Sequence, residues 1–426
     1  MENEISVEVL RAVSELERIR PAWESWPGNR ESDIDFYLTV AGSSPETVRP
    51  HVMVISRGGR PDAILVGRLD RRRIPFRLGY LNFRVKADVL FFVAGPLRGN
   101  ASPENCRLFV QEIRRSLSSG EAHAAYFHHL PTNSDLYSLV RETPGLLARD
   151  PVQETHAHFS RSLPATAEEF QRSLSLKLRS NHRWNNLARD FPNAVKVRCF
   201  TELAELEELI RDAEQVARTT YQRGLGVGFA DTLHERERLT LKARKGWLRA
   251  YILYIAQRPA AFWIGEIDGT TFGGEYTGYD PAFRKYSPGM YLTLRGIEDL
   301  CTRVSEVDFG TGWAEYKEGL CDREWTEAST YIFAPSVKGL ELRLARFLTA
   351  GLHASLSRAL ETTGFLRLAK RVWRARLRKK KAKETRTAHS SPLESLRRSH
   401  GAGREVHEKG GGDTRRLPRP AEDDRT

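Results

Sequence analysis

The chain has 426 residues, 40% of them apolar and 29% charged, which indicates two or three domains with sizeable cores. The four cysteines are far apart and the twelve histidines form no H-E-x-x-H motif, so neither a disulfide scaffold nor a metal site is expected. No apolar run reaches the ~18–20 residues that span a bilayer, and MENEISVEVL at the N-terminus is acidic. We therefore expect a cytoplasmic protein without a metal.

The net charge of +12 invites a nucleic-acid interpretation, but the charge is unevenly distributed. Residues 371–426 hold 17 Lys and Arg against 8 Asp and Glu, and the preceding 370 residues are nearly neutral. Because 379–426 is also poor in apolar residues, we interpret it as a disordered basic tail. No specific nucleic-acid partner is predicted.

Helix-like and strand-like segments alternate in the first half of the chain. Helical periodicity marks two segments, and alternating or continuous apolar runs mark four strands. The expected helices are 14–26 and 104–117, and the expected strands are 51–56, 62–69, 88–97 and 122–130.

The second half repeats this order. Two helices, three strands, a helix, a strand, a short helix and a last strand follow one another. They are 202–221, 231–246 with Asp231 as cap, 247–255, 260–267, 270–280, 287–304, 305–310, 314–320 and 327–335.

The repeated order predicts a tandem α/β protein in which each module has a mixed central sheet flanked by helices. We expect modules over 1–160 and 161–336, joined through a basic helix over 173–191. That helix is either a solvated connector or places Lys177, Arg179 and Arg183 beside an anionic ligand.

The stretch from Tyr279 to Met290 follows an apolar strand and opens an amphipathic helix. Unpaired N–H groups and a partial positive charge at a helix N-terminus bind pyrophosphate, and Pro suits the first turn. The segment from Arg284 to Met290 is therefore the expected phosphate loop. It comprises Arg284, Lys285, Tyr286, Ser287, Pro288, Gly289 and Met290.

The element order and this loop resemble the GNAT acyltransferases, whose acyl-CoA loop reads R/Q-x-x-G-x-G/A. Arg284-Lys-Tyr-Ser287-Pro-Gly289 fits, with Ser287 in place of the first Gly. Three further motifs are similar to those of the cellulose-biosynthesis-associated (CelD-like) branch, whose members are distant relatives of the Fem peptidyltransferases. In chain order they are Y-D-P-x-x-x-x-Y-S-P-G, D-F-G-x-G and E-Y-K. The resemblance covers about 165–335 and implies acetyl-CoA or another acyl-CoA as co-substrate.

A second match to the motif, Arg223-Gly-Leu-Gly226-Val-Gly228, follows a helix instead of a strand. Context decides between Gly-rich matches, so we do not assign it to CoA. It is either a flexible loop or, as the resemblance implies, the border of the acceptor pocket. In the second case Tyr221, Arg223 and Gly226 would contact the acceptor with Arg179.

Four residues are candidates for the chemistry of acyl transfer. Glu275 lies among apolar and small residues that would raise its pKa and make it a base; the alternative is a salt-bridged carboxylate. The resemblance implies that Tyr316 protonates the leaving thiolate and that Lys317 assists transfer as in the Fem enzymes, although Leu320 replaces their usual aromatic. Asp308 lies near the end of a strand, where it would either bind a ligand or cap the following turn.

Residues 337–378 have apolar residues at helical spacing with Arg and Lys between them. They either pack on the catalytic module or, with the tail, contact the inner face of an anionic membrane. The sequence thus predicts transfer from acyl-CoA to an amine or hydroxyl, such as an amino sugar or polysaccharide precursor. The alternatives are a Fem-type peptidyltransferase that uses charged tRNA, and a non-catalytic membrane- or nucleic-acid-associated protein.

Overall fold

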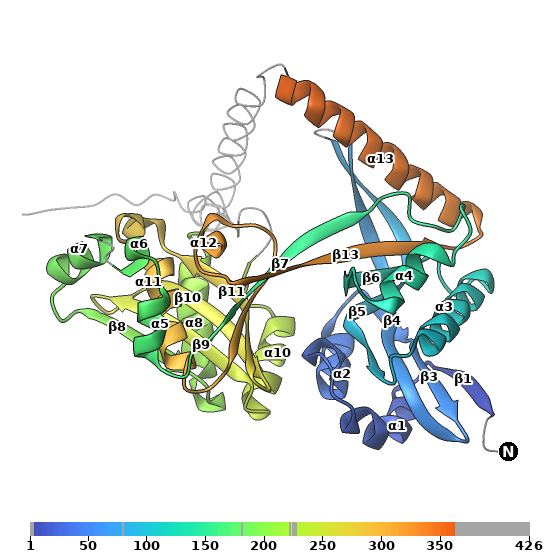
Figure 1. Cartoon of the computed structure of the whole chain (residues 1–426), viewed down its shortest axis with the longest axis horizontal. Helices are drawn as coiled ribbons and strands as arrows, with labels where there is room; N and C mark the ends of the chain where they lie inside the picture. Colours follow the sequence, from blue (N-terminus) through green and yellow to red (C-terminus); the bar gives the residue numbers. More distant parts are fainter. Residues whose placement is uncertain (1–3, 79–80, 180–181, 221–222, 224–227, 363–426) are drawn as a thin grey trace, which may run out of the picture. The chain divides into compact units, whose positions relative to one another are not determined.

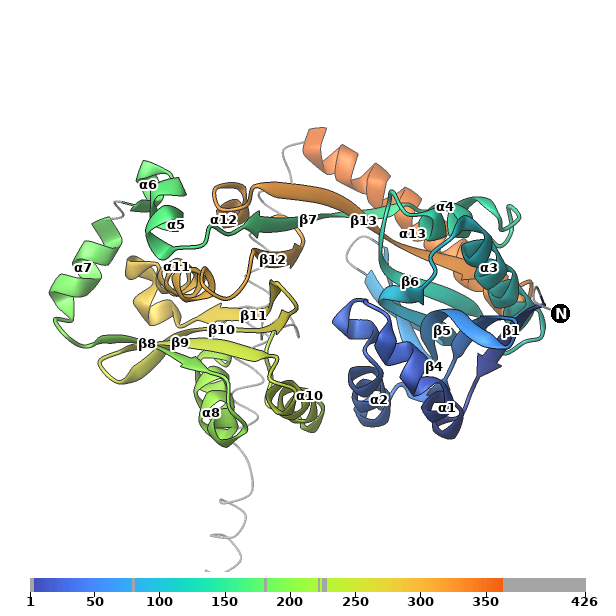
Figure 2. The same ribbon diagram turned by 60° about the horizontal axis from the view of Figure 1, so that its bottom comes forward.

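A computed structural model describes residues 4–362 except 79–80, 180–181, 221–222 and 224–227. Its centre is one mixed sheet of thirteen strands, with helices on both faces (Figures 1 and 2). The first-half strands are β1 (Ile5–Leu10), β2 (Thr47–Pro50), β3 (Val52–Arg57), β4 (Arg60–Leu78), β5 (Leu81–Gly99) and β6 (Ala124–Pro131). The others are β7 (Glu154–Ser162), β8 (Val195–Phe200), β9 (Leu248–Ile255), β10 (Arg258–Asp268), β11 (Thr271–Tyr279), β12 (Glu306–Thr311) and β13 (Arg323–Phe333). The predicted mixed α/β class is confirmed.

The helices of the first half cover the sheet in two layers. They are α1 (Val13–Ser25), η1 (Arg30–Ser32), α2 (Ile34–Ser43), α3 (Pro103–Ser118) and α4 (Asp135–Glu142). The apolar spacing of α3 brings Phe109, Val110 and Ile113 into a core that also includes α4. Trp23 of α1 and Tyr37 of α2 belong to the core on the opposite face.

The second half has the same layering. Its helices are α5 (Ala167–Ser173), α6 (Leu176–Arg179), α7 (His182–Asp190), η2 (Leu203–Glu205), α8 (Leu206–Ala217), α10 (Leu233–Arg244), η3 (Pro281–Tyr286), α11 (Pro288–Leu300) and α12 (Glu315–Glu318). Figure 2 shows α8 and α10 on one face of β8–β11, and α5 and α11 on the other. Separate apolar cores lie on these two faces, around Ile297 and around Leu209.

Equivalent strand pairs reveal the internal repeat. The sheet order is β1-β3-β4-β5-β6-β13-β7-β12-β11-β10-β9-β8, with β2 against β4. The parallel pairs are β5–β6 and β11–β12, and a helix, α3 or α11, lies between the strands of each pair. β7 and β13 continue the sheet between these halves, so the expected module boundary at 160/161 falls inside β7. Two separately folding modules stay a prediction.

The basic helix expected over 173–191 is present in part, as α6 and α7, and Leu174 and Ser175 lie outside any helix. Two other local expectations are wrong. The cap of α10 is Thr232, whose hydroxyl accepts from the Glu235 amide, while Asp231 pairs with Arg236. β4 and β5 continue far beyond 62–69 and 88–97 as a long hairpin.

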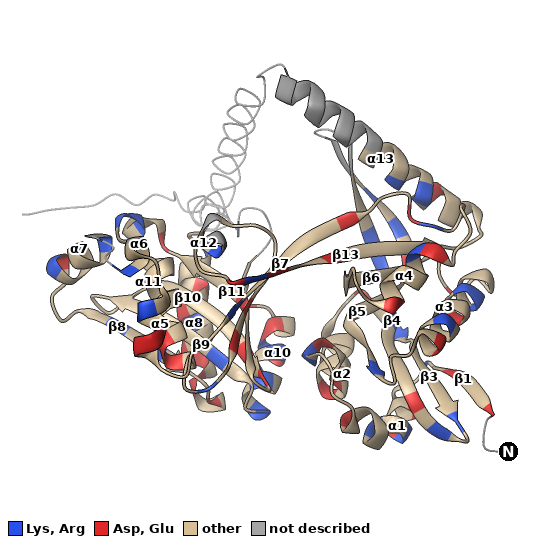
Figure 3. Ribbon diagram, in the orientation of Figure 1, with Lys and Arg blue, Asp and Glu red and all other residues tan. Residues whose placement is uncertain are grey.

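The chain after the sheet forms α13 (Val337–Thr362), and residues 363–426, including the expected tail, lie outside the described residues. Among the residues that are described, no helix is long and apolar enough to cross a membrane. In Figure 3, Lys and Arg alternate with Asp and Glu over most elements, which agrees with the near-neutral charge of this part of the sequence.

Candidate functional site

The parallel strands β11 and β12 separate soon after they begin. Their register has three pairs and ends at Gly273 opposite Asp308, although β11 continues to Tyr279 and β12 to Thr311. Backbone groups of β11 beyond Gly273 are therefore not used by β12. This opening at the carboxyl ends of parallel strands is a common ligand position in α/β folds.

A β-bulge places Glu275 at the opening. Ile264 of β10 pairs with Tyr276 and Gly265 pairs with Gly274, so Glu275 is the extra residue on β11. A Cβ at position 265 would collide with the Gly273 carbonyl oxygen, which explains the glycine there. Bulges re-aim side chains and occur beside active sites.

The expected phosphate loop lies at the far end of β11. η3 leads into α11, whose N-cap, Ser287, adopts the left-handed conformation at φ 53° and ψ 54°. Pro288 follows at the first position of α11, and the side chain of Ser287 makes no capping hydrogen bond to this helix. The first N–H groups of a helix have no acceptor within the helix, so this end presents donors for an anion.

The loop side chains divide into two groups. Arg284 and Lys285 are exposed, and Lys285 lies 3.5 Å from Asp190. Tyr286 is only 3% exposed and its hydroxyl donates to Asp190 at 2.8 Å, while Met290 packs against the core. The Tyr286 side chain therefore faces the core, so its backbone is the part of this residue that could contact a cofactor.

Ser287 explains why this sequence departs from a Gly-rich loop. Its hydroxyl accepts from Arg183 Nη1 at 2.7 Å, so a guanidinium from α7 lies at the mouth of α11. This contact brings part of the 173–191 segment to the loop.

We expect Ser287→Val to lower the free energy of unfolding by about 2 kcal/mol, because a β-branched side chain is strained in the left-handed region. Ser287→Gly should stay within about 1 kcal/mol of wild type, since relief of strain offsets the loss of the Arg183 contact. Urea denaturation of the two variants tests this. Equal losses would show that backbone conformation is not what position 287 requires.

The equivalent helix of the first half, α3, has a capped N-terminus. The Ser102 hydroxyl accepts from the Asn105 amide at 3.3 Å and thereby satisfies a donor at the N-terminus of α3. Of these two equivalent helices, α3 has a capping hydrogen bond with its N-cap side chain and α11 does not.

The expected raised pKa of Glu275 is wrong. Its carboxylate accepts from Lys242 Nζ at 2.5 Å and from Arg238, both on α10. Burial alone would raise the pKa, but these two cations outweigh it and hold the pKa of Glu275 well below its usual value. Glu275 is therefore a weak base in this arrangement.

The cation beside Glu275 also reaches the first half of the chain. Lys242 Nζ lies 2.7 Å from Glu266 Oε2, and Glu266 Oε1 lies 3.1 Å from Arg30 Nη1 of η1. Arg30 is 3% exposed and stacks over Trp247. An unbroken chain of charges thus connects Glu275 with η1.

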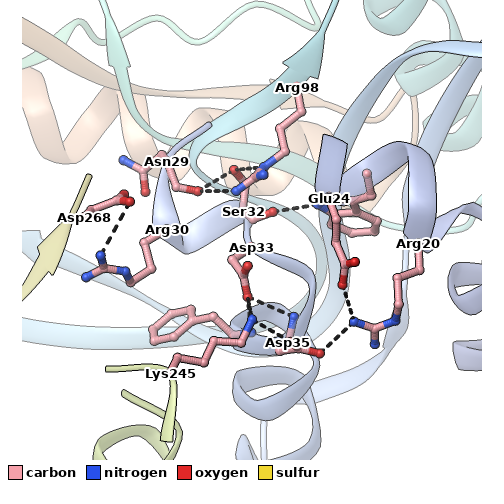
Figure 4. A network of polar contacts seen from close by, with 12 residues as sticks. Arg20, Glu24, Asn29, Arg30, Ser32, Asp33, Asp35, Arg98, Lys245 and Asp268 are labelled. Carbon is pink, nitrogen blue, oxygen red and sulfur yellow. Dashed lines mark hydrogen bonds and ion pairs between the residues drawn. The ribbon is translucent and has the colours of Figure 1, made fainter. Parts of the chain in front are cut away.

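A second set of contacts, drawn in Figure 4, supports the same face. Lys245 binds Asp33 at 3.0 Å, and Asp35 accepts from Arg20 at 2.7 Å. Arg98 donates to the Ser32 hydroxyl at 2.9 Å. These bonds fix η1 and α2 against α10, the helix that supplies Arg238 and Lys242.

Asp308 lies in a polar group that the sequence did not predict. Its Oδ1 accepts from the Gly310 amide and from His158 Nε2, both at 2.6 Å, and His158 Nδ1 lies 3.0 Å from Glu327. Burial alone would lower the pKa of His158, but the bonds to Asp308 and Glu327 raise it to about 9. His158 is a cation at neutral pH and cannot act as a base there.

Lys317 is buried, with 5% exposure, although a lysine on a short helix would ordinarily face solvent. Its Nζ donates to the carbonyls of Gly310, Thr311 and Gly312 at 3.0, 3.2 and 2.9 Å. Burial lowers the pKa of this ammonium group. Tyr316 is 36% exposed beside Phe309, so the two neighbours face different surroundings.

Two of the four predicted acceptor residues, Arg223 and Arg179, are described. Arg223 pairs with Glu214 at 2.8 Å and donates to the Phe229 carbonyl at 2.8 Å. Arg179 is exposed at the end of α6. Tyr221 and Gly226 lie outside the described residues.

Sequence analysis missed His158 and Lys242. The alternation of His156 and His158 in β7 was the available signal for a strand with one polar face. For Lys242, the spacing of four from Arg238 places both cations on one side of α10. The part of the chain that the structure describes contains no group of three or more His, Cys, Asp or Glu suited to a metal.

These features define the class of domain. Residues 177–318, about a third of the chain, match the family model described as Acetyltransferase (GNAT) domain. The separated strands, the bulge and the loop to α11 all lie in this segment. The second half is therefore similar to the GNAT acetyltransferase domain over residues 177–318.

The chain is also similar to several solved structures. FemX matches with a TM-score of 0.50 and 8% identity, over 76% of this chain and 97% of that chain. The C-terminal domain (DUF2156) of a putative lysylphosphatidylglycerol synthetase from Agrobacterium fabrum has a TM-score of 0.48 and 11% identity, over 78% and 95% of the two chains. A tandem GNAT protein from the clavulanic acid biosynthesis pathway has a TM-score of 0.44 and 12% identity, over 78% and 99%. The comparison with curated proteins gives no match.

Proposed function

We propose that the protein transfers an acyl group from acetyl-CoA or another acyl-CoA to an amine or hydroxyl acceptor. The observation that carries this proposal is the uncapped N-terminus of α11 behind the left-handed Ser287, with exposed Arg284 and Lys285 before it. The pyrophosphate would lie on the amides of Gly289 and Met290. The acyl chain would enter the opening between β11 and β12.

The reaction forms a bond between the acceptor nitrogen or oxygen and the acyl carbon, and breaks the bond from that carbon to sulfur. The acceptor loses a proton and the thiolate gains one. Tyr316, which is 36% exposed, is proposed as the acid for the thiolate. Lys317 and Asp308 hold the backbone of 310–312 and are proposed as positioning residues.

The acceptor is proposed to be an amino sugar or polysaccharide precursor, as the resemblance to the CelD-like branch implies. The same resemblance supplies the rival donor, a charged tRNA. Contact of 337–378 and the basic tail with the inner face of a membrane likewise stays a prediction.

Thermal unfolding with acetyl-CoA tests the donor. At 100 times its dissociation constant, acetyl-CoA should stabilise the wild type by about 2.7 kcal/mol. Arg284→Glu should remove most of this shift, because it reverses a charge at the phosphate loop. Arg303→Glu, which reverses an exposed charge beyond the other end of α11, should keep it.

Two outcomes would contradict the proposal. If neither acetyl-CoA nor CoA itself stabilises the wild type, the donor is not an acyl-CoA, and charged tRNA becomes the candidate to titrate. If Arg284→Glu and wild type respond equally, the pyrophosphate site lies elsewhere.

A further inference from the structure

A cavity of about 390 Å³ lies in the first half of the chain, in a region that the proposed acyl transfer does not use. We call it the Arg72 pocket and define it by Arg72, Phe91, Tyr126, His128, Tyr331 and Arg346. These residues come from β4, β5, β6, β13 and α13. Its volume is within the range of sites for small ligands.

The pocket is remote from the opening between β11 and β12. Glu154, at the start of β7, lines the pocket, whereas Ser160 of the same strand pairs with Asp308. At about 3.3 Å per residue, these positions lie about 20 Å apart along the strand. A ligand in the Arg72 pocket therefore does not occupy the proposed acyl site.

Two guanidinium groups are held over aromatic rings in this pocket. Arg72 lies 4.6 Å above Phe91, and Arg346 lies 4.8 Å above Tyr331. Stacking of this kind orients the planar fork before a ligand arrives.

The nearby carboxylates bind only some of the N–H groups of Arg72 and Arg346. Glu46 binds the Nε of Arg72 at 3.0 Å, and Glu154 binds Nη2 of Arg346 at 3.2 Å. Within residues 4–350, whose side chains are largely described, no hydrogen bond from Nη1 or Nη2 of Arg72 is found. Asp150 also binds Arg346 Nε at 2.9 Å, so the donors left for a ligand come mainly from Arg72 and Arg73.

The remaining wall supplies flat rings and neutral hydrogen-bonding groups. Burial lowers the pKa of His128 to about 3, so this imidazole is neutral, and its Nδ1 lies 3.5 Å from the Tyr126 hydroxyl. His128 belongs to a bulge of β6 opposite β13, in which His129 takes a φ of 51°. A non-glycine residue in this strained conformation marks functional sites.

The far end of the β4–β5 hairpin adds to the positive field. Arg71, Arg72 and Arg73 follow one another in β4, and Arg84 and Lys86 lie on β5. Figure 3 shows these strands with blue bands near α13.

We propose that the Arg72 pocket binds a sugar phosphate. The terminal amino groups of Arg72, with Arg73 at the rim, would hold the phosphate, since guanidinium forks match phosphate oxygens. Neutral His128 and Tyr126 would bind the hydroxyls of the sugar. Because Arg72 and Arg346 already cover the rings of Phe91 and Tyr331, these rings would position the guanidinium groups and not contact the sugar. This proposal is independent of the identity of the acyl donor.

Isothermal titration calorimetry with glucose 6-phosphate on the full chain tests it, with glucose and inorganic phosphate as comparison ligands. Saturable binding is expected for glucose 6-phosphate, and at least tenfold weaker binding for each comparison ligand. Arg72→Ala should weaken the binding of glucose 6-phosphate at least tenfold, and so should Arg73→Ala, whose exposed side chain is safe for folding. Arg60→Ala, an exposed arginine at the other end of β4, is the matched control and should bind as wild type does.

The proposal is overturned if the wild type does not bind glucose 6-phosphate, or if neither pocket variant weakens binding. Equal affinity for inorganic phosphate would overturn the assignment to a sugar phosphate. Acetyl-CoA should stabilise Arg72→Ala as much as it stabilises the wild type. A failure of sugar-phosphate binding can therefore be distinguished from a failure of acyl-CoA binding.

Discussion

Lys242→Met is expected to lower the free energy of unfolding by about 3 kcal/mol, because removal of one partner from a buried ionic group leaves the others uncompensated. Lys242 is 1% exposed and binds both Glu275 and Glu266. The methionine fills similar space but leaves two carboxylates with one fewer cation. Urea denaturation at neutral pH gives the loss directly, and Arg244→Met, an exposed residue of the same helix, should cost less than about 0.5 kcal/mol.

The pH dependence of stability identifies the carboxylate involved. Because cations lower the folded-state pKa of Glu275, its stabilising contribution is full above the unfolded value of 4.5 and is lost as the pH falls below that value. Lys242→Met raises the folded-state pKa, so its stability should change less between pH 6 and pH 3 than that of wild type. Parallel pH profiles for the two proteins would show that Glu275 does not depend on Lys242.

The sequence predicted well those helices that pack one face into the core, because their apolar residues then recur at a regular spacing. The helix expected at 104–117 became α3, and that expected at 287–304 became α11, because each presents apolar residues at helical spacing. The loop before α11 was predictable because its chemistry is local: a strand end, a turn and a helix mouth are contiguous in sequence.

Other features depend on residues distant in the chain. α10 turns Arg238 and Lys242 inward, so its buried face is charged and periodicity of apolar residues does not reveal it. The small neighbours of Glu275 implied a raised pKa, whereas its partners come from a helix more than thirty residues earlier. β7 lies between β12 and β13, a register that no local signal specifies.

Lys317→Met is expected to lower the free energy of unfolding by about 2 kcal/mol, because hydrogen bonds from a charged donor are worth about 1.5–3 kcal/mol. The ammonium group is the shared donor to three successive carbonyls in 310–312. Gly310 and Gly312 have φ of 69° and 89°, so this segment bends in a way that few residues permit, and Lys317 holds the bend together. Lys317→Arg should recover part of the loss.

Hydrogen exchange locates the effect without any assumption about the acceptor. The Gly310 amide donates to Asp308 and the Gly312 amide to the Ala157 carbonyl, and both should exchange at least tenfold faster in Lys317→Met. Lys196→Met, which removes an exposed charge from β8, should leave their exchange unchanged. Unchanged exchange in Lys317→Met would show that the segment is held by its glycines and by Asp308 alone. Faster exchange would establish Lys317 as the residue that fixes the end of β12, where the opening toward β11 begins.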